Sequence, residues 1–134
     1  MQEGVTYQFG AAIDPTELAG LFVGTTWADG RSADKIKIML ENSTLHISVW
    51  REGKIIGFLR VITDNVYRAV LDDLVVHPNF RKQGIGTEIM RQMMKRLEHL
   101  EEISLDCEDE LLPYYAKFGF LPDQFNCVRV WRRK

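Results

Sequence analysis

Apolar and polar residues alternate along several short segments of the chain, which is the pattern of half-buried strands. The first such segment holds Val5, Tyr7 and Phe9, and a second covers residues 45–50. Two longer, mostly apolar runs follow at residues 55–62 and 67–76. The turn-forming sequences R-E-G-K and T-D-N separate these last three segments, so we expect them to form an antiparallel meander.

Apolar positions three or four residues apart predict helices elsewhere in the chain. The first helix has an N-cap in Asp14, a second runs to about residue 42, and a third, the longest, reaches about residue 100. A fourth, short helix ends at Gly119, a residue that favours helix termination. The expected starts are Pro15, Ser32 or Asp34, Ile85 and Glu108.

A strand, a helix and a further strand at residues 103–107 form a βαβ unit, which implies a parallel pair. The apolar residues Val128, Val130 and Trp131 predict a closing strand. The expected fold class is therefore α/β (α+β): a mixed sheet of about six to seven strands, with an antiparallel meander followed by a βαβ unit and about four flanking helices. No linker divides the chain, so residues 1–134 are expected to form one domain.

The composition and charge of the chain argue against several classes of function. The chain has 134 residues, 46% of them apolar, and its 17 basic and 19 acidic residues give a net charge of −2, which argues against a nucleic-acid-binding domain. Two cysteines without metal-ligand spacing predict free thiols in a reducing compartment and no metal site. Neither a signal peptide nor a membrane-length apolar run is present, so a cytoplasmic protein without membrane contact is expected.

The candidate chemistry gathers in residues 70–87, V-L-D-D-L-V-V-H-P-N-F-R-K-Q-G-I-G-T. The loop from Arg81 to Gly86 carries two cations and two glycines directly before the helix that begins at about Ile85. Glycines allow close backbone approach, and free N–H groups at a helix N-terminus attract anions, so the loop predicts a pyrophosphate site. Asp72 and Asp73 lie within the preceding apolar strand and indicate proton chemistry beside that anion.

Two motifs resemble those of the GNAT superfamily of acetyl-CoA-dependent N-acetyltransferases. The sequence R-K-Q-G-I-G matches the family's R/Q-x-x-G-x-G/A signature, and Y-Y-A-K-F-G-F matches its F-Y-x-K-x-G-F segment. The matching residues are Arg81, Gly84, Gly86, Tyr115, Lys117, Gly119 and Phe120. The pattern is similar to the small serotonin N-acetyltransferase-like and glucosamine-phosphate acetyltransferase-like branches. One departure is Leu111, where many members have a coenzyme-contacting Asn.

The resemblance implies that acetyl-CoA is the co-substrate and assigns roles to residues. Tyr115 is the candidate acid for the leaving thiolate and a coenzyme contact. Asp73 is the preferred general base and Asp72 the reserve, and their adjacent charges are expected to raise one pKa. The remaining coenzyme-binding residues implied are Leu74, Val75, Val76, Arg81, Lys82, Gln83, Gly84, Ile85, Gly86 and Thr87.

Structural alternatives accompany these assignments. One or both aspartates can simply pair with Arg60 or Arg68, and Arg60 itself either pairs across the sheet or faces solvent. Tyr115 has the alternative of a core tyrosine. Trp27 is either a core plug or an aromatic wall of an acceptor pocket, for which the candidate substrate-binding residues are Trp27, Arg60 and Thr63.

The resulting interpretation is an N-acetyltransferase that transfers acetyl from acetyl-CoA to a primary amine of a small molecule by direct attack in a ternary complex. The alternatives are a protein or peptide N-acetyltransferase and a non-catalytic acyl-CoA-binding sensor. The sequence leaves the amine and the oligomeric state open, with a homodimer as one option.

Overall fold

A single mixed sheet forms the centre of the molecule. The computed structural model describes residues 3–122, 128 and 130–133, and within them the sheet has five strands in the order β1-β2-β3-β4-β5. The first four strands pair antiparallel, and β4 and β5 pair parallel. The strands are β1 (Val5–Phe9), β2 (Leu45–Arg51), β3 (Lys54–Thr63), β4 (Arg68–Val76) and β5 (Glu102–Ser104).

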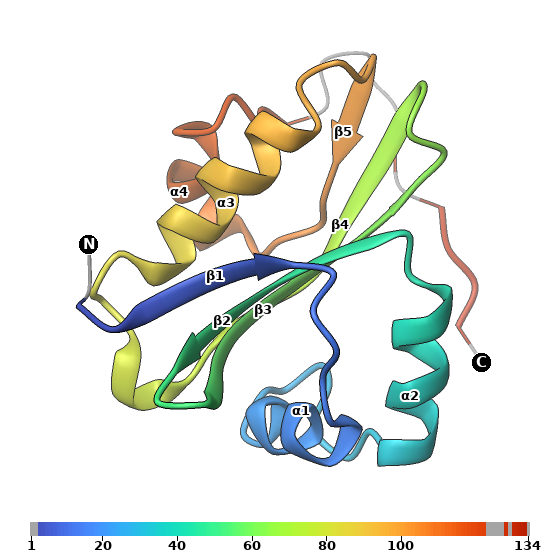
Figure 1. The fold of residues 1–134 in the computed structure, drawn as a ribbon. Helices are drawn as coiled ribbons and strands as arrows, with labels where there is room; N and C mark the ends of the chain where they lie inside the picture. Colours follow the sequence, from blue (N-terminus) through green and yellow to red (C-terminus); the bar gives the residue numbers. More distant parts are fainter. Residues whose placement is uncertain (1–2, 123–127, 129, 134) are drawn as a thin grey trace.

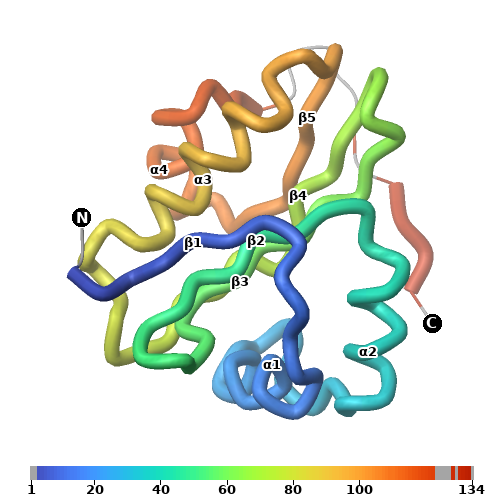
Figure 2. Tube along the Cα trace, viewed as in Figure 1, coloured from blue at the N-terminus to red at the C-terminus, as the bar shows by residue number. Residues whose placement is uncertain are grey.

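Helices cover both faces of this sheet. Figure 1 and the tube in Figure 2 show α3 and α4 on one side and α1 and α2 on the other. The helices are α1 (Pro15–Phe22), α2 (Ala33–Asn42), α3 (Ile85–Arg96) and α4 (Leu112–Ala116), with short 3₁₀ turns at Pro78–Phe80 and Asp109–Leu111. No helix within the described residues is both long and apolar enough to cross a membrane.

Local capping signals define the starts of α1 and α2 as the sequence predicts. Asp14 accepts a hydrogen bond from the Thr16 backbone N–H, and Ser32 accepts one from Lys35, so Ser32 is the N-cap of α2. Gly84 precedes α3 with a φ of 85°, a left-handed conformation that glycine adopts without strain. The expected start of the fourth helix at Glu108 is wrong, because a short 3₁₀ turn comes first and α4 begins at Leu112.

The mixed sheet, the meander and the parallel pair are confirmed, but the expected count of about six to seven strands is wrong for the described residues, which form five. The predicted closing strand is the main difference. Val128, Val130 and Trp131 belong to no strand and are 80%, 88% and 56% exposed. Alternation alone does not form a strand, because a strand also needs a neighbouring edge for its backbone hydrogen bonds.

Two apolar layers hold the helices on the sheet. The larger lies under α3, where Ile89 and Met93 are fully buried against residues of β2, β3 and β4. The second lies under α1 and α2 and includes Phe22, Ile36 and Phe58. The faces of β4 are therefore packed against different helices, which determines where its polar residues can point.

The α3 layer provides a test of the fold. Ile89→Ala removes a fully buried side chain and is expected to lower the free energy of unfolding by about 2–5 kcal/mol, measured by urea denaturation. Ile38→Ala on α2, where the side chain is 58% exposed, is the control and should change stability by less than about 0.5 kcal/mol. Equal effects of the two changes would contradict this assignment of the core.

Candidate active site

A β-bulge in β4 determines how the acidic side chains of the site are oriented. The register between β3 and β4 shifts between Phe58 and Arg60, and Asp73 has a φ of 63°, in the left-handed region. Adjacent residues of a regular strand point to opposite faces, whereas a bulge interrupts that alternation. Here it allows the neighbouring carboxylates Asp72 and Asp73 to reach the same side chain, that of Arg60.

Arg60 joins the two carboxylates. Its Nη2 donates to Asp72 Oδ2 at 3.0 Å and its Nε donates to Asp73 Oδ2 at 2.5 Å. The Asp73 side chain is 1% exposed and that of Asp72 is 50% exposed, so the two acids differ in environment although they are adjacent in sequence. Of the alternatives for Arg60, cross-sheet pairing is the one that the structure adopts.

Arg31 extends this cluster to the loop between α1 and α2. Its Nη1 donates to Asp73 Oδ2 at 2.8 Å, and its guanidinium lies 5.2 Å from the centre of the Phe22 ring. The same loop carries Trp27, which is 50% exposed and packs edge-on against Phe22 at 5.9 Å. Asp73 Oδ1 is buried and has no hydrogen-bond partner among the described residues, which is costly unless a donor reaches it.

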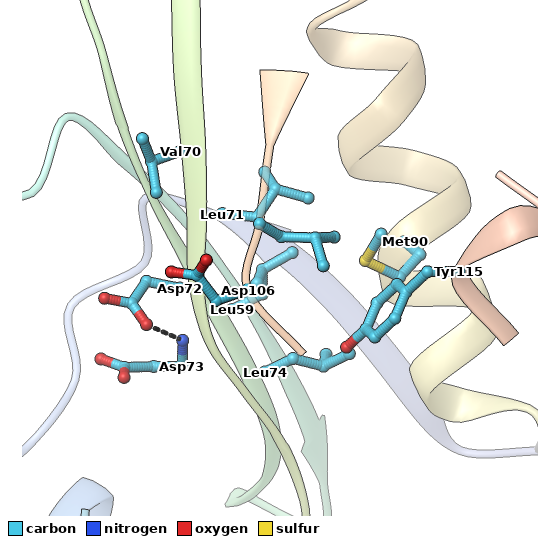
Figure 3. Close-up of a pocket in the computed structure, with 10 residues that line it drawn as sticks. Leu59, Val70, Leu71, Asp72, Asp73, Leu74, Met90, Asp106 and Tyr115 are labelled. Atoms are coloured by element: carbon cyan, nitrogen blue, oxygen red, sulfur yellow. Dashed lines mark hydrogen bonds between the residues drawn. The ribbon is translucent and has the colours of Figure 1, made fainter. Parts of the chain in front are cut away.

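A cavity of about 170 Å³ opens beside the bulge, and Figure 3 shows its lining. Strands β4 and β5 pair only from Arg68 to Val70, after which the cavity separates residues 71–74 from Leu105 and Asp106. Tyr115 of α4 lines the side opposite the two acids and points its hydroxyl toward β4 near Leu74. Asp72, Asp73 and Tyr115 therefore line one cavity, with the two carboxylates and the Tyr115 hydroxyl on opposite sides of β4.

Burial and neighbouring charges shift the pKa values of two residues that line this cavity, Asp72 and Tyr115. Desolvation, and then the charge of Asp73, raise the pKa of Asp72, although the neighbouring Arg60 and Arg31 oppose the shift. Burial raises the pKa of Tyr115 to about 12, so its phenol stays protonated at neutral pH. The cavity thus pairs a carboxyl of raised pKa with a protonated phenol, which are suitable groups for proton acceptance and donation.

The glycine loop forms a second hollow, of about 200 Å³, at the N-terminus of α3. A Cβ on Gly86 would lie 3.5 Å from the Tyr114 hydroxyl and 3.7 Å from Val76 Cγ2, so glycine keeps open the gap between β4 and α4. The hollow is lined by Val76, Phe80, Arg81, Lys82, Gly84, Ile85, Gly86, Thr87 and Tyr114. This arrangement fits a phosphate group of the coenzyme.

Other predicted site residues lie outside these hollows. Thr63 is the last residue of β3, where its hydroxyl donates to Arg68 O at 2.6 Å and accepts from the Asn65 N–H. Val75 is buried under α1 and α2, and the Gln83 side chain donates to Asn79 O at 3.3 Å. Trp27 does not line the acid cavity.

Four residues that the sequence did not single out line or support the site: Arg31, Phe80, Asp106 and Tyr114. Arg31 lies 42 positions before its partner Asp73, so no local pattern links the two. Within the described residues, no group of three or more metal-ligating side chains is placed to hold a metal ion.

Arg60 is expected to stabilise the fold as well as the site. Arg60→Met leaves Asp72 and the buried Asp73 without their shared cation, and breaking a buried ion pair in this way costs about 3–5 kcal/mol. Urea denaturation at neutral pH should show a loss of this size. Arg68→Met removes an exposed pair with Glu102 and serves as the control, with an expected loss below about 1 kcal/mol. An Arg60 variant as stable as this control would contradict the interpretation of the cluster.

Known proteins resemble this chain in sequence and fold. The uncharacterized N-acetyltransferase ycf52 of Porphyra purpurea is 34% identical over 113 residues, which cover 80% of this chain and 64% of that protein. The chloroplastic serotonin N-acetyltransferase 2 of Oryza sativa subsp. japonica is 28% identical over 115 residues, 78% of this chain and 56% of that protein. The chain thus spans less than two thirds of the length of both relatives.

A solved structure supports the fold. The GNAT-family acetyltransferase SP0256 of Streptococcus pneumoniae superposes with a TM-score of 0.81 at 19% identity and covers 97% of this chain and 98% of that one. The model of the Acetyltransferase (GNAT) family matches residues 14–120, which include the bulge, the glycine loop and Tyr115. This protein therefore belongs to the GNAT family of acetyltransferases.

Proposed function

We propose that the protein transfers acetyl from acetyl-CoA to the primary amine of a small molecule by direct attack, with both substrates bound together. The observation that carries the proposal is the shared cavity, in which a carboxyl of raised pKa and a protonated phenol line the gap between β4 and β5. The rice relative, named for serotonin, supports a small amine as acceptor.

Asp72 is the residue that we assign as the general base, with Asp73 as its electrostatic partner. The sequence ranks Asp73 first, but Asp73 is buried and bound by both Arg31 and Arg60, so its charge is already engaged. Asp72 is half exposed, and its raised pKa brings its basicity closer to that needed to accept a proton near neutral pH.

The proton transfers balance as follows. The substrate ammonium gives one proton to Asp72, directly or through water, and the free amine attacks the thioester carbonyl carbon. As the tetrahedral intermediate collapses, the C–S bond breaks and the Tyr115 phenol protonates the departing thiolate. The second proton of the amine nitrogen restores the phenol, and Asp72 releases its proton to solvent. The products are an amide, free CoA and one proton.

The family uses acetyl-CoA as its acetyl donor, and the geometry offers it two contacts. Within the part of the chain that the structure describes, β4 has no parallel partner beyond Val70, so the backbone of Leu74, Val75 and Val76 would bond the pantetheine arm like an added strand. The loop from Arg81 to Thr87 would hold the pyrophosphate at the start of α3.

On the acceptor side, three acidic residues line the cavity and would favour a cationic amine: Asp72, Asp106 and Asp73, of which the last has a buried carboxylate. The unpartnered Asp73 Oδ1 offers a buried acceptor to an ammonium or to a bridging water. Trp27, Arg60 and Thr63 do not line this cavity, so in the proposed scheme they would contact only a part of the acceptor that extends beyond it.

An amine panel with thiol detection tests the proposal against its alternatives. Arylalkylamines, polyamines, aminosugars and peptides are each incubated with acetyl-CoA, and CoA release is measured. Saturable release with a small amine supports the proposal. Release only with peptides would favour a protein acetyltransferase, and acetyl-CoA binding without turnover of any amine would favour a sensor.

Tyr115→Phe tests the acid. Loss of the hydroxyl should lower kcat by about 10²–10⁴-fold, because the thiolate must then leave unprotonated. The dissociation constant of acetyl-CoA should change little, since the ring remains. Tyr67→Phe, in which the altered side chain is 60% exposed, is the matched control and should keep full kcat. Unchanged kcat in Tyr115→Phe would contradict the assignment.

The pH profile tests the base. If Asp72 must be ionised, kcat/KM falls as the pH drops through its pKa, and Asp72→Asn abolishes that limb together with most of the activity. Arg31→Gln removes a cation that lowers the pKa of Asp72, so the acid limb should move to higher pH. A limb that stays in place in Arg31→Gln, or survives in Asp72→Asn, would show that another group is titrating.

A further inference from the structure

Tyr114 lies in the glycine-loop hollow, away from the acid cavity that its neighbour Tyr115 lines. Resting on the proposed use of acetyl-CoA, we propose that the Tyr114 hydroxyl is a direct hydrogen-bond donor to the coenzyme's pyrophosphate, with Thr87 as its partner. The two adjacent tyrosines of α4 would then contact two separate groups of the same coenzyme: Tyr115 the sulfur, Tyr114 the pyrophosphate.

The Tyr114 hydroxyl lies close to the N-terminus of α3, where an anion can bind. Tyr114 Oη lies 3.3 Å from Thr87 Oγ1, and Thr87 is the third residue of α3. The first backbone hydrogen bond inside this helix runs from Glu88 N to Gly84 O, so the N–H groups before Glu88 have no partner within the helix. An anion bound to those N–H groups would lie beside the Tyr114 hydroxyl.

The hydroxyl groups of Tyr114 and Thr87 have a proton left to donate. Two hydroxyl groups that share one hydrogen bond use one of their two protons, so the other proton remains available to a further acceptor. Phosphate oxygens are strong acceptors, and hydrogen bonds to charged groups are stronger than those between neutral groups. The pair of Tyr114 and Thr87 therefore supplies at least one donor to a phosphate without adding a cation.

The Tyr114 ring is held in place by its neighbours. Tyr114 lies edge-on to Tyr115 at 5.1 Å and to Phe118 at 5.5 Å, and Lys117 Nζ lies 5.8 Å from its ring centre. These contacts hold the ring before any ligand binds, so little side-chain freedom is lost on binding. The absence of a side chain at Gly86 keeps the space in front of the hydroxyl clear.

The test compares a ligand that carries the pyrophosphate and the 3′-phosphoadenosine with one that carries neither. Dephospho-CoA, which keeps the pyrophosphate and lacks the 3′-phosphate, is included and should lose affinity in Tyr114→Phe as CoA does. Calorimetry measures the dissociation constants of CoA, which has the pyrophosphate, and of pantetheine, which lacks it, for the unmodified protein, Tyr114→Phe and the control Tyr67→Phe. Tyr114→Phe should weaken CoA binding by about 10-fold, the loss expected for one hydrogen bond to a charged group. Pantetheine binding should not change, and Tyr67→Phe should match the unmodified protein with every ligand.

In turnover, the same variant should raise KM for acetyl-CoA and leave kcat near its original value, unlike Tyr115→Phe. Unchanged CoA affinity would overturn the inference, as would an equal loss for pantetheine, which would indicate a packing role. Binding of CoA without acetylation of any amine would reject the proposed reaction but leave the Tyr114 assignment standing. Failure of the unmodified protein to bind CoA would reject both.

Discussion

The site depends on the ion pairs that one arginine, Arg60, forms with two adjacent carboxylates. Arg60 can hold both Asp72 and Asp73 only because β4 is bulged, since a regular strand would turn one of them toward α3. The left-handed conformation of Asp73 is tolerated in a residue with a short polar side chain, and two arginines bind its buried carboxylate. Backbone irregularity and charge pairing therefore support each other.

The bulge also explains why the two acids differ. Asp73 is buried between Arg31 and Arg60, whereas Asp72 is more exposed, and desolvation together with the charge of Asp73 raises the pKa of Asp72. Across the cavity, burial raises the pKa of Tyr115 to about 12. In our scheme, a proton acceptor and a proton donor thus line one small space, without any metal ligand cluster among the described residues.

Local signals in the sequence were sufficient for the first three helix starts, the meander, the parallel unit and the glycine loop, because each depends on neighbouring residues. Asp72 and Asp73 could not be ranked in that way, since their environments depend on the register of β4 against β3. Arg31 was missed because its contact joins residues 42 positions apart. The location of Tyr114 depends on how α4 packs beside α3, which no motif encodes. The prediction of a closing strand was wrong for the described residues, because an alternation of apolar and polar residues does not specify which strand it pairs with.

The division of β4 between two apolar layers has an evolutionary consequence. Before the bulge, Ala69 and Leu71 pack under α3, and after it Val75 packs under α1 and α2. The helix that begins at the glycine loop and the loop that carries Arg31 therefore rest on separate sets of core residues. If the proposed sites are correct, substitutions beneath α1 and α2 would alter acceptor recognition while the residues that support the coenzyme site stay unchanged. Such a scaffold could then change its acceptor without losing its acetyl donor.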